Sequence, residues 1–220
     1  MDQCSSFRAL ISMQQLKVLF YKIVNKLIVQ TEVKTIISDK RVVYLTFDDG
    51  PEDGITEFVL KELAKYNFKA TFFCRGDNAE KNPKLLASIR KAGHAVANHT
   101  YSHPHAYEVT AKDYLADVER ANDVLQTKLL RPPHGSLTLK IWIKLQKKYK
   151  IVYWSLNSSD YELGNFHLQR AIETLKSKTK NGDIVLFHFC HRHEKETRQL
   201  LPEYLKWLNE LGFVSLAISE

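Results

Sequence analysis

The side chains best suited to chemistry in this sequence stand just after short apolar runs. They comprise three aspartates, three histidines and one arginine: Asp48, Asp49, His99, His103, Arg131, Asp160 and His188. If the apolar runs are parallel strands, their carboxyl ends meet at one edge of the sheet, where α/β folds keep their chemistry. The pattern therefore favours one site assembled from five separate segments of the chain.

Two histidines and one carboxylate form a frequent ligand set for a catalytic divalent metal, because a further position stays open for water. His99 and His103 are four residues apart, so one helical turn would bring both imidazoles to the same side. Asp49 is the natural third ligand. Each motif also has a structural alternative, since Asp-Asp-Gly is a common turn and an isolated histidine pair is often only structural. Their joint occurrence after successive strands favours the metal site.

The remaining polar groups suit proton transfer beside such a metal. Adjacent strand residues face opposite ways, so Asp48 is expected to point away from Asp49. It would then serve as a base on a metal-bound water, whose pKa the ion lowers. His188 is the matching acid, and Arg131 would orient a carboxylate through two parallel hydrogen bonds.

Hydrophobic patterns predict the elements that position these groups. Runs rich in β-branched and aromatic residues predict strands over residues 42–47, 70–74, 95–97, 129–130, 151–154, 184–187 and 213–218. Apolar residues at three- and four-residue steps predict helices over residues 56–66, 83–92, 112–127, 139–149, 168–178 and 194–211. This alternation implies right-handed βαβ units. We expect an α/β fold, a distorted or incomplete (β/α) barrel of about seven parallel strands, with an additional N-terminal helix.

The first 38 residues differ from the rest of the chain. Their apolar residues recur with helical spacing and have lysines between them: Leu16, Leu19, Phe20, Ile23, Val24, Leu27 and Ile28. We expect residues 1–38 to form an amphipathic helix with its lead-in, and residues 39–220 to form the domain that holds the site. The helix packs on that domain or lies on a membrane surface as a basic amphipathic helix.

The composition excludes several classes of protein. The 220 residues are 44% hydrophobic and 26% charged, with 8 Gly and 6 Pro, which suits one globular domain and not a disordered chain. A formal net charge of +7 favours anionic partners, but the basic residues are spread out, so no nucleic-acid partner is expected. Residues 10–29 contain three lysines and do not form a membrane span. No signal peptide is apparent, which predicts a cytoplasmic or peripheral membrane location.

The cysteines and the last histidines have two interpretations each. Cys4, Cys74 and Cys190 are an odd number at wide spacings, which argues against a disulfide framework and favours reduced, partly buried thiols. Cys190 lies near the site and is also a candidate sensitive thiol. His191 and His193 form a solvated basic loop or, alternatively, line the groove or form an adventitious metal cluster.

The site residues stand in five ordered motifs that together resemble the polysaccharide deacetylase family, also called carbohydrate esterase family 4. The resemblance runs from about residue 41 to about residue 218. Residues 46–51 (Thr-Phe-Asp-Asp-Gly-Pro) and 99–103 (His-Thr-Tyr-Ser-His) are similar to the first and second motifs. Residues 131–135 (Arg-Pro-Pro-His-Gly) and 184–188 (Ile-Val-Leu-Phe-His) are similar to the third and fifth. The fourth is represented by residues 157–161 (Asn-Ser-Ser-Asp-Tyr).

The resemblance implies a role for each of these residues. Asp48 is the catalytic base, His188 the general acid, and Arg131 orients the base. The backbone amide of His134 helps to hold the oxyanion, and Asp160 holds Arg131. The metal ligands are Asp49, His99 and His103. They hold one divalent ion, Zn²⁺ in most members and Co²⁺ or Ni²⁺ in some.

The activity implied is metal-dependent removal of N-acetyl groups from N-acetylglucosamine-type residues of a poly- or oligosaccharide, with release of acetate. The chain departs from the family pattern at Asn157, Tyr161, His134 and Phe189, where the family often has Asp, Trp, Tyr and Asp. None of these departures removes a ligand, acid or base, but they leave the choice of polysaccharide open. Two other functions stay open: a carbohydrate-binding relative with little or no turnover, and a metal hydrolase that acts on a different bond.

Overall fold

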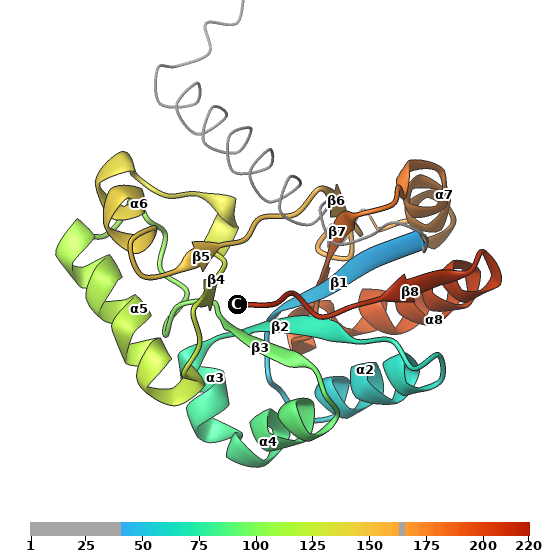
Figure 1. Cartoon of the computed structure of the whole chain (residues 1–220), viewed down its shortest axis with the longest axis horizontal. Helices are drawn as coiled ribbons and strands as arrows, with labels where there is room; N and C mark the ends of the chain where they lie inside the picture. Colours follow the sequence, from blue (N-terminus) through green and yellow to red (C-terminus); the bar gives the residue numbers. More distant parts are fainter. Residues whose placement is uncertain (1–40, 163–165) are drawn as a thin grey trace, which may run out of the picture.

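The computed structural model describes residues 41–162 and 166–220, and the predicted α/β fold is confirmed (Figure 1). One parallel sheet has the strand order β5-β4-β3-β2-β1-β7-β6, and β8 pairs with the start of β1. Its strands are β1 (Arg41–Asp49), β2 (Ala70–Cys74), β3 (Ala95–Asn98), β4 (Leu129–Leu130), β5 (Lys150–Ile151), β6 (Leu156–Asn157), β7 (Asp183–His188) and β8 (Phe213–Ser215). The sheet curls into an incomplete, distorted barrel.

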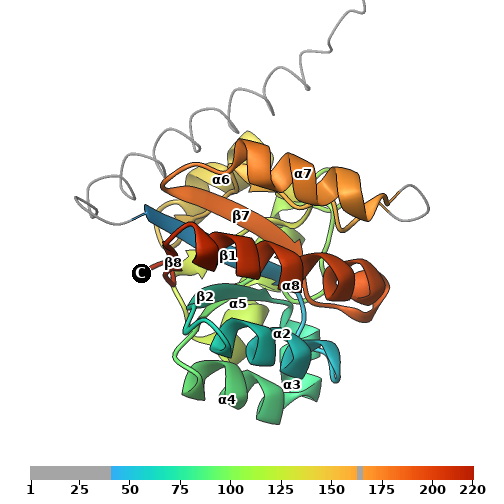
Figure 2. The ribbon, with the colours of Figure 1, turned by 90° about the vertical axis from the view of Figure 1, so that its right-hand side faces the viewer.

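Helices cover the outer side of the curled sheet. They are α2 (Ile55–Ala64), α3 (Gly76–Lys81), α4 (Pro83–Lys91), α5 (Ala111–Leu125), α6 (Leu139–Leu145), α7 (Leu168–Lys178) and α8 (Glu194–Glu210), with single turns η1 (Pro133–Gly135) and η2 (His191–His193). Figure 2 shows α7, α8, α2 and α4 in a row along the outside of β7, β1 and β2. The motif residues are left at the carboxyl ends of the strands.

Strand β1 lies at the centre because its sequence is apolar on both faces. Val43, Leu45 and Phe47 pack in the core beneath the helices, whereas Val42 and Tyr44 pack in a second core inside the curl. β1 pairs with β2 on one side and β7 on the other. A strand buried on both faces reads as a continuous hydrophobic run, which is why this segment predicted a strand so clearly. Its last residues are thereby carried to the centre of the sheet edge.

The prediction of a single strand over residues 151–154 was wrong. This segment contains the end of β5, which pairs with β4, and is followed by β6, which pairs with β7 at the opposite edge of the curl. Between them the chain passes from β4 to β7: the Val152 N–H donates to the Leu130 carbonyl at 2.8 Å, and the Ser155 N–H donates to the Ile184 carbonyl at 2.9 Å. There the carbonyl groups of Val152 and Tyr153 each accept a hydrogen bond of 3.2 Å from the Arg131 guanidinium. The buried Arg131 side chain thus satisfies carbonyl groups that a neighbouring strand would satisfy in a regular sheet.

Two other boundaries were predicted too long. Helix α6 ends at Leu145, where residues up to 149 were expected, and β8 ends at Ser215, where residues up to 218 were expected. The short elements α3, η1 and η2 were not predicted, because single turns bury too few residues to show a period.

The predicted helix at residues 1–38 lies outside the described residues, so the division of the chain at residue 38 stays a prediction. None of the helices in the described ranges is long and apolar enough to cross a bilayer.

Candidate active site

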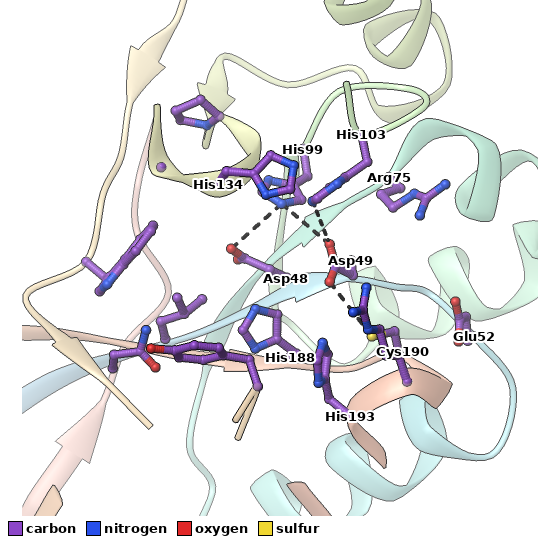
Figure 3. Close-up of a pocket in the computed structure, with 17 residues that line it drawn as sticks. Asp48, Asp49, Glu52, Arg75, His99, His103, His134, His188, Cys190 and His193 are labelled. Atoms are coloured by element: carbon purple, nitrogen blue, oxygen red, sulfur yellow. Dashed lines mark hydrogen bonds and ion pairs between the residues drawn. The ribbon is translucent and has the colours of Figure 1, made fainter. Parts of the chain in front are cut away.

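A pocket of about 550 Å³ lies at the carboxyl ends of the strands (Figure 3). Six of the eight predicted site residues line it: Asp48, Asp49, His99, His103, His134 and His188. The other two, Arg131 and Asp160, are fully buried behind it and contact residues that line it. The structure therefore brings together the groups from all five motifs.

Three of these side chains converge on one point. Asp49 Oδ1 lies 3.2 Å from His103 Nε2 and 3.6 Å from His99 Nε2. The three potential ligand atoms all lie within 4.8 Å of one another. Asp49 Oδ1 is buried, and it accepts no well-formed hydrogen bond from the described residues. A buried oxygen without a hydrogen bond, facing two imidazole nitrogens, fits a divalent cation, so these residues are suited to hold one.

A hydrogen bond to Nδ1 of His99 determines which ring nitrogen carries the proton. His99 Nδ1 lies 2.8 Å from the carbonyl oxygen of Arg131. Because a carbonyl only accepts, Nδ1 carries the proton and Nε2 offers its lone pair to the pocket. Burial lowers the pKa of His99 to about 4, which keeps the ring neutral, as a metal ligand must be.

The carboxylate ligand is held in its charged form. Burial raises the pKa of Asp49, but His103 3.2 Å away, together with His99 and His188, outweighs that effect. The net pKa of Asp49 lies well below its ordinary value. The Asp49 carboxylate therefore stays ionised near neutral pH and faces both histidine rings.

The two histidines do not share a helical turn, which corrects the sequence interpretation. Residues 99–103 form a loop in which Thr100 and His103 have left-handed backbone, with φ of 64° and 61°. The His103 N–H donates to Thr100 Oγ1, and Asp117 on α5 accepts from the N–H of Tyr101 at 2.9 Å. Side-chain hydrogen bonds thus shape the loop. The sequence did not predict the part of Asp117, because this residue lies within a regular helical pattern.

Asp48 and Asp49 both approach His99, so the expectation that they face opposite ways was wrong. Asp48 Oδ2 lies 3.9 Å from His99 Nε2, and Asp49 Oδ1 lies 3.6 Å from the same atom. Asp49 has left-handed backbone, with φ of 85°, at the last position of β1. The strand's alternation breaks there, and both carboxylates face the pocket.

Arg131 holds Asp48 from behind. Its Nη1 donates to Asp48 Oδ1 at 2.7 Å and to Thr46 Oγ1 at 2.8 Å. The guanidinium is 0% exposed and lies over the ring of Phe73, with Cζ 4.0 Å from the ring centroid. Arg131 thus contacts Asp48, as its predicted orienting role requires. The sequence analysis does not predict a role for Thr46, although an aliphatic hydroxyl within an apolar central strand was the available signal.

Asp160 holds His188 in the same manner. Its Oδ1 lies 2.8 Å from His188 Nδ1, its Oδ2 accepts the His188 N–H at 2.7 Å, and Thr197 Oγ1 lies 3.0 Å from Oδ2. Burial alone would lower the pKa of His188, but Asp160 raises it to about 9, with help from Asp49 and Asp48. The imidazole is therefore protonated near neutral pH, and its Nδ1 is committed to Asp160.

The prediction that Asp160 holds Arg131 was therefore wrong. Asp160 follows β6, and β6 pairs with β7, the strand that ends at His188. Ser159 has left-handed backbone, with φ of 65°, and turns the chain so that the next side chain reaches His188. Arg131 instead bonds to β1 and to the two carbonyl groups between β5 and β6.

His134 lies in η1 with left-handed backbone, with φ of 56°. Its ring stacks on His105 at 4.3 Å and meets His103 edge-on at 4.7 Å. Burial and the two neighbouring imidazoles lower the pKa of His134. Gly135 follows, and a side chain there would collide with Trp154, since a Cβ would stand 2.6 Å from the indole. The proposed part of the His134 amide in holding an oxyanion stays a prediction.

Several pocket residues were missed or misjudged in the sequence. Trp154 lines the pocket, whereas the sequence pattern predicts it only as the end of a strand. The loop after β7 is solvated only in part, because the His191 side chain is 56% exposed whereas His193 is 7% exposed and lines the pocket. Cys190 is buried, as predicted, and also lines the pocket.

Residues 36–154 match the family model described as polysaccharide deacetylase. The chain belongs to the polysaccharide deacetylase family. It is 37% identical over 132 residues to a peptidoglycan-N-acetylglucosamine deacetylase of Bacillus cereus, covering 56% of this chain and 48% of that protein. A second such deacetylase of the same organism is 29% identical and covers 83% of this chain and 89% of its own length.

Solved structures of the family share the fold. A family 4 carbohydrate esterase from Streptomyces lividans, in complex with acetate, has a TM-score of 0.73 and 29% identity, covering 83% of this chain and 95% of the other. A peptidoglycan deacetylase from Bacillus subtilis has a TM-score of 0.73 and 26% identity, covering 82% and 89%. Among curated relatives, the chain spans 48% of the length of one and 40% of another, a peptidoglycan-N-acetylmuramic acid deacetylase of Bacillus subtilis.

Proposed function

We propose that this chain is a metal-dependent N-deacetylase that hydrolyses the acetamido group of N-acetylglucosamine-type residues in a glycan of the peptidoglycan kind, with release of acetate. The observation that carries the proposal is the arrangement of one pocket. A ligand triad, a carboxylate held by a buried arginine and a protonated imidazole held by a buried aspartate all face the same space. Membership of the family and the names of the relatives supply the substrate class.

Each proposed role follows from a contact. Asp49, His99 and His103 would hold the divalent ion, which supplies polarisation of the acetyl carbonyl and a lowered pKa for the attacking water. Asp48, oriented through Oδ1 by Arg131, takes the proton from that water with Oδ2. The backbone N–H of His134 donates to the oxyanion that develops.

His188 completes the reaction as the acid. With Nδ1 bound to Asp160, the imidazolium donates its Nε2 proton to the departing amine, which leaves as the free amino sugar. Its raised pKa keeps that proton available at neutral pH. A protonated acid and an oriented base in one pocket suit turnover better than binding alone.

The test is acetate release from N-acetylglucosamine oligomers and from purified peptidoglycan. The wild-type protein is stripped with a chelator and restored with Zn²⁺, Co²⁺ or Ni²⁺, which also ranks the metals. We expect release that depends on the metal and that Asp48→Asn abolishes. Metal-loaded protein that binds the oligomers but releases no acetate from either substrate would instead identify a carbohydrate-binding relative. Release from simple amides but not from sugars would identify a hydrolase of a different bond.

The separate part expected at residues 1–38 is a further proposal: a basic amphipathic helix that holds residues 39–220 at a membrane surface. Its support is the apolar spacing with lysines between. Co-sedimentation with anionic liposomes, with and without residues 1–38, tests it. Equal sedimentation of both forms would contradict membrane contact.

A further inference from the structure

A second set of metal-ligating atoms lies on the other oxygen of Asp49. The thiol of Cys190 lies 3.8 Å from Asp49 Oδ2, whereas the two histidines of the first triad approach Oδ1 (Figure 3). Asp49, Cys190 and His193 each offer one ligand atom, and the three atoms lie within 4.8 Å of one another. We infer that these residues form a second metal site, selective for a divalent cation that accepts sulfur and nitrogen ligands, such as Zn²⁺ or Co²⁺.

The ligands of this second site are buried and incompletely bonded. Cys190 is 5% exposed and His193 is 7% exposed. His193 Nδ1 is buried and has no hydrogen-bond partner among the residues that the structure describes. A buried imidazole nitrogen without a partner costs free energy, and a metal ion held in this cluster would reorient and satisfy the ring. The His193 side chain lines the same pocket, so an ion can reach it.

The distances suit a tetrahedral cation. Zinc bonds sulfur at about 2.3 Å and nitrogen or oxygen at about 2.0–2.2 Å, so its ligand atoms stand roughly 3.4–3.6 Å apart. The 3.8 Å between Cys190 Sγ and Asp49 Oδ2 is close to this separation. Only small side-chain movements are needed for the remaining pairs. Water would complete the coordination from the pocket side.

Local structure explains why Cys190 and His193 lie together. Phe189 is fully buried, and its N–H donates to the Asp48 carbonyl at 3.0 Å, which fixes the chain beyond β7. Cys190 caps the start of the turn η2, and the His193 N–H donates to its carbonyl at 3.1 Å. Residues three apart in such a turn face the same side. His191 faces elsewhere, and its ring contacts Glu52 and Asp53.

The charges of the pocket accommodate two cations. Asp48, Asp49 and Glu52 line it, and the thiolate of Cys190 adds a further negative charge when its proton passes to solvent on metal binding. Two metal ions about 3.5–4 Å apart are a recurring arrangement in hydrolases. Arg75, Arg192 and protonated His188 also line the pocket and oppose the second ion, so its affinity is expected to be lower than that of the first.

The experiment is a cobalt titration of the metal-stripped full chain, read by elemental analysis and by the near-ultraviolet charge-transfer absorption of a cobalt–thiolate bond. We expect two Co²⁺ per chain and this absorption in the wild type. Cys190→Ser should bind one Co²⁺ without the absorption, and His193→Gln should also bind one. The matched controls Cys74→Ala and His191→Ala should keep both ions, because Cys74 points into the core and His191 faces away.

The cobalt stoichiometry and absorption of the wild-type protein test the second site even if a variant fails to fold. A single Co²⁺ per chain, or two without thiolate absorption, would overturn the second site. So would absorption that persists in Cys190→Ser, because another thiol would then be its source. His103→Ala should lose the first ion and keep the thiolate absorption. This pattern separates the second site from the proposed deacetylase activity, which depends on the first ion and is measured by acetate release.

Discussion

Two ion pairs border the pocket, and they are built in opposite senses. In the pair between β1 and β4, the carboxylate of Asp48 faces the pocket and the Arg131 cation is buried behind it. In the pair between β6 and β7, the imidazole of His188 faces the pocket and the Asp160 carboxylate is buried. One pair thus presents a negative group and the other a positive group to the same space.

The buried member of each pair comes from the weaker part of the sheet. Arg131 follows the two-residue strand β4, and Asp160 follows the two-residue strand β6, whereas Asp48 is the last but one residue of the long strand β1 and His188 ends β7. Because an unpaired buried charge is costly, each buried residue must find its partner when the barrel closes. The long strands therefore place the two groups that face the pocket, and the short ones supply the buried charges that hold them.

The largest loss of stability is expected when the buried Arg131 cation is removed. Arg131→Met leaves the buried Asp48 carboxylate and two backbone carbonyls without their donor. The free energy of unfolding should fall by about 3–5 kcal/mol, measured by denaturant unfolding of the metal-free protein. Lys148→Met, which breaks the exposed pair with Glu119, is the matched control and should cost about 0–1 kcal/mol. Equal losses in both variants would remove the structural role given to Arg131.

Removal of the His188 imidazolium, which faces the pocket, should lower turnover and leave metal binding unchanged. His188→Ala removes the proposed acid, and kcat should fall by about 10²–10⁴-fold. The first-site ion should stay bound, since Asp49, His99 and His103 are unchanged. The measurement is acetate release together with metal content by elemental analysis. A variant that loses that ion would show that His188 acts on the metal site and not as the acid.

The pH dependence of stability and of kcat tests the pair formed by His188 and Asp160. Asp160 raises the pKa of His188 from 6.5 to about 9, so the charged pair stabilises the metal-free protein below pH 6.5, and that stability is lost as pH rises through about 9. Asp160→Asn should abolish this loss and move the alkaline limb of the kcat profile to lower pH. The measurements are unfolding and acetate release across this range. An unchanged alkaline limb would contradict the assignment of His188 as the acid.

The smallest effects are expected at the threonines behind each pair. Thr46→Val removes a hydroxyl that Arg131 contacts, and Thr197→Val removes one that Asp160 contacts. Each should cost about 1 kcal/mol of unfolding free energy, because the ion pairs themselves remain. Both should change kcat far less than His188→Ala does. A shift of the pH profile in Thr197→Val as large as that in Asp160→Asn would assign the control of His188 to the hydroxyl.

Much of the site was predictable from residue types and order. Polar residues after apolar runs marked the carboxyl ends of parallel strands, and the run at β1 was clear because that strand is buried on both faces. The five ordered motifs indicated the family. The predicted metal ligands came from two histidines and a carboxylate at successive strand ends, and the structure brings the three potential ligand atoms within 4.8 Å of one another.

Backbone geometry at the site was not predictable in this way. Asp49, Thr100, His103, His134 and Ser159 all have positive φ, which non-glycine residues adopt rarely. Such conformations persist where surrounding contacts determine them, and they concentrate at functional sites. No propensity of these residue types announces them, so the alternation expected at Asp48 and the helical turn expected at His99 both failed.

The sequence by itself determined the α/β alternation, the central apolar strands and the set of chemical groups, because these depend on local pattern and residue type. Only tertiary structure decided the partner of Asp160 and the place of His193. Asp160 binds His188 and not Arg131 because β6 returns to β7, and His193 turns inward to Cys190 because η2 follows the end of that strand. Such pairings depend on how distant strands meet when the barrel closes, and that closure leaves no mark in local spacing.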